Sequence, residues 1–235
     1  MQIVDSLRVF VPTCNNYLWA LRPFAYLFNA MWSDRQQVIV GGFAHPDFAL
    51  PPNFRFYQID KIDYPPERWS NGIIKMLAAF PDEYIILMLE DYWLRRKVDV
   101  RGVATCYQYI KDHPRVLRID LTDDRQYAGG MYDIDTFDCY DIIETPPSTP
   151  YQFSTQAGLW RKSLLLDLLL PNKTAWETEI HTAPPGSMRV LGTRQKPVAY
   201  ANAILKGKID KKELAKLPQK ERETINPWIP ERLIP

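Results

Sequence analysis

The feature that most constrains the fold is an apolar run that ends in two adjacent carboxylates. Residues Tyr84 to Leu89 are apolar or aromatic and follow the turn-forming pair Pro81-Asp82. This pattern predicts a strand buried on both faces of a sheet. Glu90 and Asp91 come directly after it. Since ligands gather beyond the carboxyl ends of such strands, the two acids form either a binding site or a solvated pair at a strand end.

Strand and helix patterns alternate along most of the chain. Strands are predicted at 7–11, 38–40, 54–59, 84–89, 116–119, 151–160 and 188–191, and helices at 17–32, 70–80, 103–111, 161–170 and 211–217. This order is that of an α/β sheet with helices on its faces. Residues 122–150 are rich in Gly, Asp and Pro and predict an irregular segment or a short meander. The last residues predict extended, Pro-rich chain.

Composition narrows the class of protein. The chain has 235 residues, of which 46% are hydrophobic and 24% charged, and this balance predicts an ordinary soluble globular protein. A formal net charge of +1 gives no overall field that would attract nucleic acid or membranes. Three widely spaced cysteines form neither a zinc motif nor a disulfide framework. We see no signal-peptide pattern and no membrane-spanning apolar run, so a cytoplasmic location is expected.

Several common catalytic motifs are absent from the sequence. It contains no Rossmann glycine motif, no Walker sequence, no serine elbow and no His-Glu-X-X-His. The function must therefore be sought in other patterns.

Three short segments stand out by their order and spacing. The first is Leu89-Glu90-Asp91-Tyr92, the second is Gln156 to Arg161 with the later Trp176-Glu177-Thr178-Glu179, and the third is Tyr200-Ala201-Asn202-Ala203 with Lys206-Gly207-Lys208. Together they resemble the GT-A-type nucleotide-sugar-dependent glycosyltransferases, in particular small bacterial and phage-borne members. The resemblance implies a single GT-A-like α/β domain at 1–208, with a mixed, mostly parallel central sheet and helices on both faces. A charged, Pro-rich tail at 209–235 would pack on the domain or on a partner.

The resemblance also implies a reaction. A sugar would move from a nucleotide diphosphate donor, such as a UDP-sugar, to an acceptor hydroxyl. Charge develops on the leaving phosphates, and a divalent metal, Mn²⁺ or Mg²⁺, held by carboxylates can neutralise it. Asp91 is the expected metal ligand, and Glu90 would face ribose or sugar hydroxyls or orient Asp91. His181 is a second metal candidate, with a structural hydrogen bond as its alternative role.

An inverting enzyme of this kind also needs a general base near the acceptor hydroxyl. The resemblance places the catalytic carboxylate at Glu177 or Glu179. Trp176 beside Glu177 is expected to provide an apolar wall that raises the pKa of that carboxyl. The alternative is a pair of solvated acids in the first turn of a helix.

Donor-binding candidates come from four places in the sequence. They are Pro12, Thr13, Asn15 and Asn16 after the first strand, Trp69, Ser70 and Asn71 at the start of a helix, Glu90 and Asp91, and Asn202, Lys206 and Lys208 in the closing segment. Asn side chains can pair with a base edge, and a helix N-terminus can bind phosphate. An ordinary turn, simple helix capping and a basic surface turn are the respective alternatives.

The acceptor and two rival functions stay open. The acceptor would be a glycan, a lipid-linked sugar or a hydroxymethylated base in phage DNA, although acids interleave with the basic residues of the tail. The motif reads Glu-Asp rather than Asp-X-Asp, which leaves a non-catalytic binding protein on the same fold as one rival. A metal-dependent nucleotidyltransferase is the other.

Overall fold

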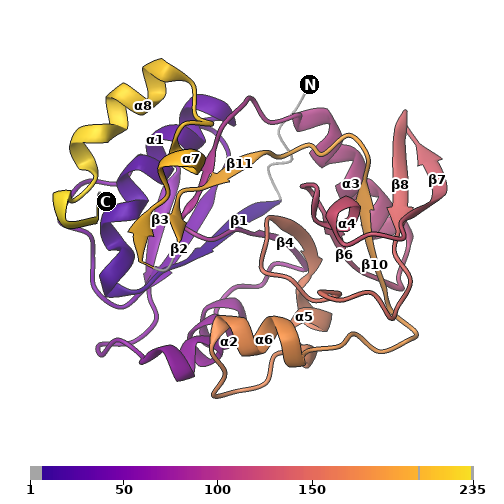
Figure 1. Ribbon diagram of the computed structural model, residues 1–235. Helices are drawn as coiled ribbons and strands as arrows, with labels where there is room; N and C mark the ends of the chain where they lie inside the picture. Colours follow the sequence, from indigo (N-terminus) through magenta and orange to yellow (C-terminus); the bar gives the residue numbers. More distant parts are fainter. Residues whose placement is uncertain (1–6, 206, 234–235) are drawn as a thin grey trace.

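The computed structural model describes residues 7–205 and 207–233. Within these residues nine strands form one sheet in the order β3-β2-β1-β4-β9-β6-β10-β8-β7 (Figure 1). The strands are β1 (Arg8–Pro12), β2 (Val38–Gly42), β3 (Phe54–Gln58), β4 (Tyr84–Leu87), β6 (Val116–Asp120), β7 (Tyr132–Phe137), β8 (Tyr140–Glu144), β9 (Gly158–Arg161) and β10 (Arg189–Thr193). Strands β8 and β9 run antiparallel to their neighbours, and the others share one direction.

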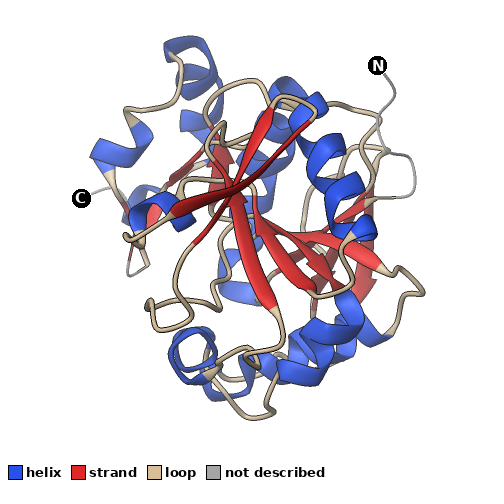
Figure 2. Ribbon diagram, turned by 90° about the vertical axis from the view of Figure 1, so that its right-hand side faces the viewer, coloured by secondary structure: helices blue, strands red, loops and turns tan. Residues whose placement is uncertain are grey.

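Helices cover both faces of this sheet (Figure 2). The α-helices are α1 (Leu21–Met31), α2 (Trp69–Ala78), α3 (Val100–Asp112), α4 (Asp124–Tyr127), α5 (Lys162–Leu168), α6 (Ala175–His181), α7 (Lys211–Leu214) and α8 (Gln219–Ile225). The 3₁₀ helices are η1 (Asn15–Ala20), η2 (Pro66–Arg68), η3 (Asn226–Trp228) and η4 (Glu231–Leu233). The mixed α/β architecture with a mostly parallel central sheet is as the sequence predicts.

The two hydrophobic clusters follow from the alternation of side chains along buried strands. In β1, Val9 and Val11 join one cluster with α1 and α3, whereas Phe10 joins the other with α2 and α5. Neighbouring residues of a strand face opposite sides, so a strand covered on both sides must be apolar throughout. This is why β1, β2 and β4 appear in the sequence as unbroken apolar runs.

Two short strand pairs lie beside the main sheet. Strand β5 (Tyr92–Leu94) pairs antiparallel with β11 (Tyr200–Asn202), and β12 (Ile204–Leu205) pairs with β13 (Lys208–Ile209). The first pair brings the chain after the acidic couplet against a segment more than a hundred residues later. This pairing therefore fixes the path of the chain where it leaves the acidic couplet.

Two local predictions differ from the structure. Of the predicted strand 151–160, only the part from residue 158 onward pairs in the sheet, as β9, because the preceding loop forms hydrogen bonds with side chains instead of a strand ladder. The last residues are not extended throughout, since α8 begins after Pro218, whose restricted φ suits a helix start.

The C-terminal tail packs against α1 and the hydrophobic cluster to which α1 belongs. Leu217, Ile225 and Ile229 belong to the same hydrophobic cluster as α1, and the Trp228 ring lies 5.7 Å from that of Tyr26. The division of the chain at residue 208 stays a prediction. No helix in the described part of the chain is both long and apolar enough to span a membrane.

Candidate active site

The acidic couplet lies in a tight turn at the carboxyl end of β4. The strand ends at Leu87, and backbone hydrogen bonds then shape the turn. The Tyr92 N–H donates to the Leu89 carbonyl at 3.2 Å, and the Ala203 N–H donates to the Asp91 carbonyl at 3.2 Å. The indole Nε1 of Trp93 donates to the Glu90 carbonyl at 3.1 Å. These bonds fix both carboxylates at the edge where parallel strands end.

A cavity of about 420 Å³ opens beside this turn. Its described lining combines the loop after β1, the segment before α2, the acidic couplet and the first residues of α6. Aromatic side chains form much of its wall, namely Tyr17, Phe43, Tyr64, Trp69 and Trp176. A mostly apolar cleft of this size with a few converging polar groups is typical of a small-molecule site.

Glu90 and Asp91 are both largely removed from water. Glu90 is 8% exposed, and its Oε1 accepts a hydrogen bond from the Thr13 hydroxyl at 3.1 Å. Burial raises the pKa of the Glu90 carboxyl, and the negative charge of Asp91 raises it further. Burial also raises the pKa of Asp91. The Oδ1 atom of Asp91 is buried and has no hydrogen-bond partner among the described residues.

Because burying the charged form of Glu90 costs free energy, we expect the stability of the protein to depend on pH. The pKa of Glu90 in the folded protein lies above its ordinary value of 4.5, so between these two values the folded protein binds more protons than the unfolded chain. The free energy of unfolding must therefore fall as pH rises through that window. We expect Glu90→Gln to stabilise the metal-free protein by about 1–3 kcal/mol near pH 9, and to have little effect near pH 5. Urea unfolding at both pH values measures this difference.

Other titrating groups contribute equally to the free energy of unfolding of the wild-type protein and the variant, so their contributions cancel in the difference. Gln can still accept the hydrogen bond from Thr13, so the variant removes the charge and keeps that contact. An equal effect of Glu90→Gln at both pH values would contradict a buried, uncompensated carboxylate at this position.

The structure brings together six of the predicted donor-binding residues. Pro12, Thr13, Asn16, Trp69, Glu90 and Asp91 all line the cavity. Asn15 does not line it, since its Oδ1 accepts from the Ala44 N–H and its own N–H donates to Asp63. Lys208 is exposed in β13, Asn202 lines a different cavity, and Lys206 lies outside the described residues. Position in the sequence alone therefore could not tell which of the candidates line the cavity.

Ser70 and Asn71 hold α6 in position and do not line the cavity. The Ser70 hydroxyl accepts from the Lys173 N–H at 3.0 Å, and Asn71 exchanges two hydrogen bonds with Asn172. Helix α2 begins one residue before Ser70, so Ser70 is not its N-cap. These contacts tie the start of α6 to α2 and so keep Trp176 at the mouth of the cavity, where it is 68% exposed.

The two candidate bases have different environments. Glu177 completes a capping box, in which Thr174 and Glu177 each accept a hydrogen bond from the other's backbone N–H. The hydrogen bond from the Thr174 N–H lowers the pKa of Glu177. The expected increase beside Trp176 is therefore wrong, because the indole is exposed and the local bond stabilises the ionised form.

Glu179 instead contacts the loop before β9. Its Oε1 accepts hydrogen bonds from both the backbone N–H and the hydroxyl of Thr155, each at 2.6 Å. Thr155 also bonds to the Tyr92 side chain, and the charges of Asp91 and Glu179 both help to raise the pKa of Tyr92, after burial. Glu179 thus lies near Tyr92 and the loop before β9, and neither Glu179 nor Glu177 is part of the described cavity lining. His181 is exposed at the end of α6 and does not line the cavity.

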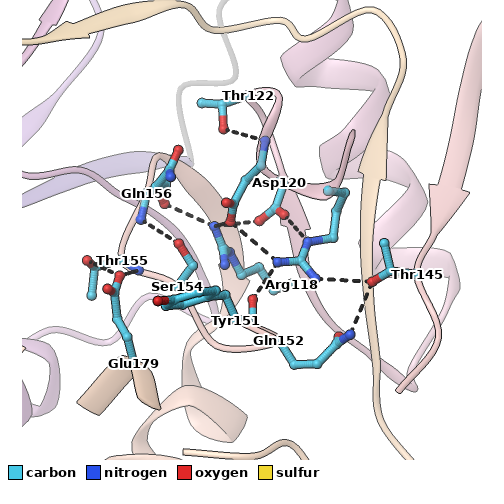
Figure 3. A network of polar contacts seen from close by, with 12 residues as sticks. Arg118, Asp120, Thr122, Thr145, Tyr151, Gln152, Ser154, Thr155, Gln156 and Glu179 are labelled. Carbon is cyan, nitrogen blue, oxygen red and sulfur yellow. Dashed lines mark hydrogen bonds and ion pairs between the residues drawn. The ribbon is translucent and has the colours of Figure 1, made fainter. Parts of the chain in front are cut away.

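A buried charge network holds that loop in position (Figure 3). Asp120 at the end of β6 is fully buried and forms ion pairs with Arg118 and Arg125. Arg118 donates to the Gln156 carbonyl at 3.2 Å, and Arg125 donates to the Tyr151 carbonyl. The loop that carries Thr155 is therefore attached on both sides of that residue.

Sequence reasoning did not identify this network, although one signal was present. An arginine in the middle of the apolar strand β6 is unusual and requires a buried partner. Gly158 leaves room for it, because a Cβ there would lie 2.6 Å from Arg118 Nε. Asp63, Tyr64 and Phe43 were also missed, since they line the cavity from loops that carry no motif.

One oxygen atom beside the cavity suits a divalent cation, although the described part of the cavity has no complete set of protein ligands for it. No group of three His, Cys, Asp or Glu side chains in the described ranges could hold a metal by itself. The unpartnered, buried Oδ1 of Asp91 is however an oxygen donor of the kind that Mg²⁺ and Mn²⁺ prefer. Mg²⁺ sites commonly combine one or two carboxylates with substrate phosphates, so the residues present fit a cation that a diphosphate helps to bind.

Comparisons with known proteins bear on the fold. No protein-family model matches the chain, and no curated protein matches it. A crystal structure of S. aureus TarS, residues 1–349, aligns with a TM-score of 0.52 and 16% identity over 83% of this chain and 60% of that one. The chain thus covers only about three fifths of TarS in that structure.

Two further structures align with lower scores. TarS in complex with UDP-GlcNAc has a TM-score of 0.46 and 14% identity, and the alignment covers 82% of this chain and 57% of that one. The mannosyltransferase PcManGT from Pyrobaculum calidifontis, in complex with GDP-Man and Mn²⁺, has a TM-score of 0.46 and 14% identity, covering 79% and 56%. On the first alignment, the chain has the α/β fold of the GT-A-type glycosyltransferases.

Proposed function

We propose that this protein transfers a sugar from a nucleoside diphosphate donor to an acceptor hydroxyl. The observation that carries the proposal is the buried, unpartnered Asp91 Oδ1 beside a 420 Å³ cavity at the end of β4. In a GT-A-type fold this strand end is where activated donors and their metal ions bind. The acidic couplet, the aromatic wall and the carboxylate of Glu179, which lies on the helix whose first residues line the cavity, together suit glycosyl transfer.

The charges of the cavity support a metal-assisted donor. Asp63, Glu90 and Asp91 line it, and no Lys or Arg does so among the described residues. A diphosphate would therefore meet negative side chains and no positive one among the described residues unless a cation accompanied it. Asp91 would hold Mn²⁺ or Mg²⁺ through Oδ1, and the ion would neutralise the charge that develops on the leaving diphosphate.

The same cavity favours a nucleobase that carries a ring N–H. Asp63 Oδ1 is buried without a hydrogen-bond partner, while Oδ2 accepts from the Asn15 N–H at 2.8 Å. The free oxygen can accept the ring N–H of uracil or of guanine, whereas cytosine and adenine nucleotides have no ring N–H. Tyr64 and Phe43 offer flat faces beside it, with ring centroids 4.9 Å apart. A UDP-sugar is the donor that we propose.

Glu179 is the general base in this proposal. Thr155 holds Oε1 with two hydrogen bonds, and Oε2 makes no hydrogen bond to a described residue. That oxygen is free to accept a proton from the acceptor hydroxyl as the new glycosidic bond forms. Glu177 has a local structural role in the capping box, with one oxygen engaged and a lowered pKa. It is therefore the weaker candidate.

Asp91→Asn tests the donor site. Titration calorimetry with UDP and UDP-sugars, with and without Mn²⁺, should show Mn²⁺-assisted binding to the wild-type protein. We expect the variant to lose at least about tenfold in affinity with Mn²⁺ present, because the amide is a poor ligand for the ion. Asp47→Asn is the matched control, since Asp47 is an exposed acid outside the cavity.

The outcomes separate the rival functions. Unchanged Mn²⁺-assisted binding in Asp91→Asn would contradict the proposed metal ligand. Release of pyrophosphate instead of nucleoside diphosphate from the donor would support a nucleotidyltransferase. Donor binding without turnover, for every acceptor class tested (glycan, lipid-linked sugar and hydroxymethylated DNA), would support a binding protein.

A further inference from the structure

A second cavity lies beside the β5–β11 strand pair that follows the acidic turn. It has a volume of about 270 Å³, and its lining includes Arg95, Arg96, Lys196 and Asn202. Asn202 of β11 pairs in register with Tyr92, the residue that follows Asp91. The Tyr200 ring, which also lines this cavity, stacks on Tyr92 with centroids 4.1 Å apart. This aromatic stack connects the residue after the acidic couplet with the lining of the second cavity.

The charge of the second cavity is opposite to that of the first. Lys216 and Glu213 in its lining form an ion pair with each other. The other charged residues of the described lining are three cations, Arg95, Arg96 and Lys196, and one carboxylate, that of Asp123. Arg95 and Lys196 make no ion pair within the described part of the chain. Such a cluster is suited to bind an anion with several oxygen atoms.

A second observation concerns an uncharged group. Asn202 Oδ1 is buried and has no hydrogen-bond partner among the described residues. A buried acceptor without a donor is costly, so this atom calls for a ligand that carries a hydroxyl or an N–H. If the amide is rotated, its NH₂ group would instead meet the same ligand as a donor.

We propose that this cavity binds a phosphate ester that also carries free hydroxyl groups. The phosphate would lie against Arg95, Arg96 and Lys196, and a hydroxyl of the same molecule would donate to Asn202. With the proposed function, the molecule is the acceptor, because its hydroxyls then lie next to the acidic turn. The binding itself does not depend on that function.

The test uses binding in the absence of divalent metal. With EDTA present the first cavity offers a phosphate no cation among its described residues, so binding reports on the second. The wild-type protein is titrated with inorganic phosphate and with glycerol 3-phosphate, followed by calorimetry or by ³¹P NMR. We expect both to bind, and glycerol 3-phosphate to bind more tightly, because only it can reach Asn202 with a hydroxyl.

The variants assign the contacts. The double variant Arg95→Gln/Lys196→Asn should lower the affinity for both ligands about tenfold or more. Asn suits position 196, where φ is +49°. Arg55→Gln/Lys220→Gln removes two exposed charges elsewhere and should change affinity less than about twofold. Asn202→Ala should weaken glycerol 3-phosphate alone.

Three outcomes would overturn the proposal. These outcomes are the absence of phosphate binding, equal affinity of the wild-type protein and Arg95→Gln/Lys196→Asn, or binding of inorganic phosphate without binding of glycerol 3-phosphate. A failure here leaves Mn²⁺-assisted donor binding at Asp91 unaffected. A failure of donor binding would likewise leave the phosphate result intact, so the two proposals fail separately.

Discussion

Replacing Glu179 by Gln is expected to lower kcat by about 10²–10⁴-fold and to leave donor affinity unchanged. Gln keeps an oxygen that can accept the two hydrogen bonds from Thr155, so the loop before β9 should stay in position. It cannot accept the proton of the acceptor hydroxyl. The measurement is release of nucleoside diphosphate at saturating donor and acceptor, with donor affinity measured separately by calorimetry.

Glu177→Gln is the matched control for that experiment. Gln is as acceptable as Glu at the third position of a capping box, so the start of α6 should be preserved. We expect a change in kcat of less than about threefold, since proton transfer is not involved. Full loss of activity in Glu177→Gln with normal activity in Glu179→Gln would reverse the assignment of the base.

Asp120→Ala is expected to lower the free energy of unfolding by about 3–5 kcal/mol. Asp120 is 0% exposed and compensates the charges of Arg118 and Arg125, which are also fully buried. Removal of the acid leaves two guanidinium groups in the core without their main counter-charge. Urea or thermal unfolding measures the loss.

An exposed ion pair provides the comparison. Asp133 pairs with Arg194 at 2.6 Å on the surface, and Asp133→Ala should cost less than about 1 kcal/mol. The same small cost for Asp120→Ala would mean that the buried network does not hold the Thr155 loop. Nearly complete loss of folded Asp120→Ala protein would agree with the expected direction, and Asp120→Asn then gives a measurable intermediate.

The sequence was sufficient to predict the fold class. Buried strands such as β1, β2 and β4 must be apolar on both faces, so they appear as continuous apolar runs that local pattern can detect. The acidic couplet was found for the same reason, because it ends one of these runs. The strand 151–160 was predicted too long, since a loop held by side chains leaves no periodic signal.

The lining of the cavity was only partly predictable. Thr13 and Asn16 follow a predicted strand and could be expected at its end, whereas Asp63 reaches the cavity from an irregular loop. Ser70 and Asn202 have the right chemistry but contact other parts of the molecule. Such choices depend on contacts between residues far apart in the chain, which residue type and spacing do not encode.

A crystal structure of the protein with UDP and Mn²⁺ would show directly whether Asp91 holds the metal ion of a bound donor. We predict that the ion contacts Asp91 Oδ1 and the diphosphate, and that the uracil ring lies near Asp63 and Tyr64. A nucleotide bound elsewhere on the molecule, or an ion that leaves the Asp91 carboxylate without a contact, would contradict the account.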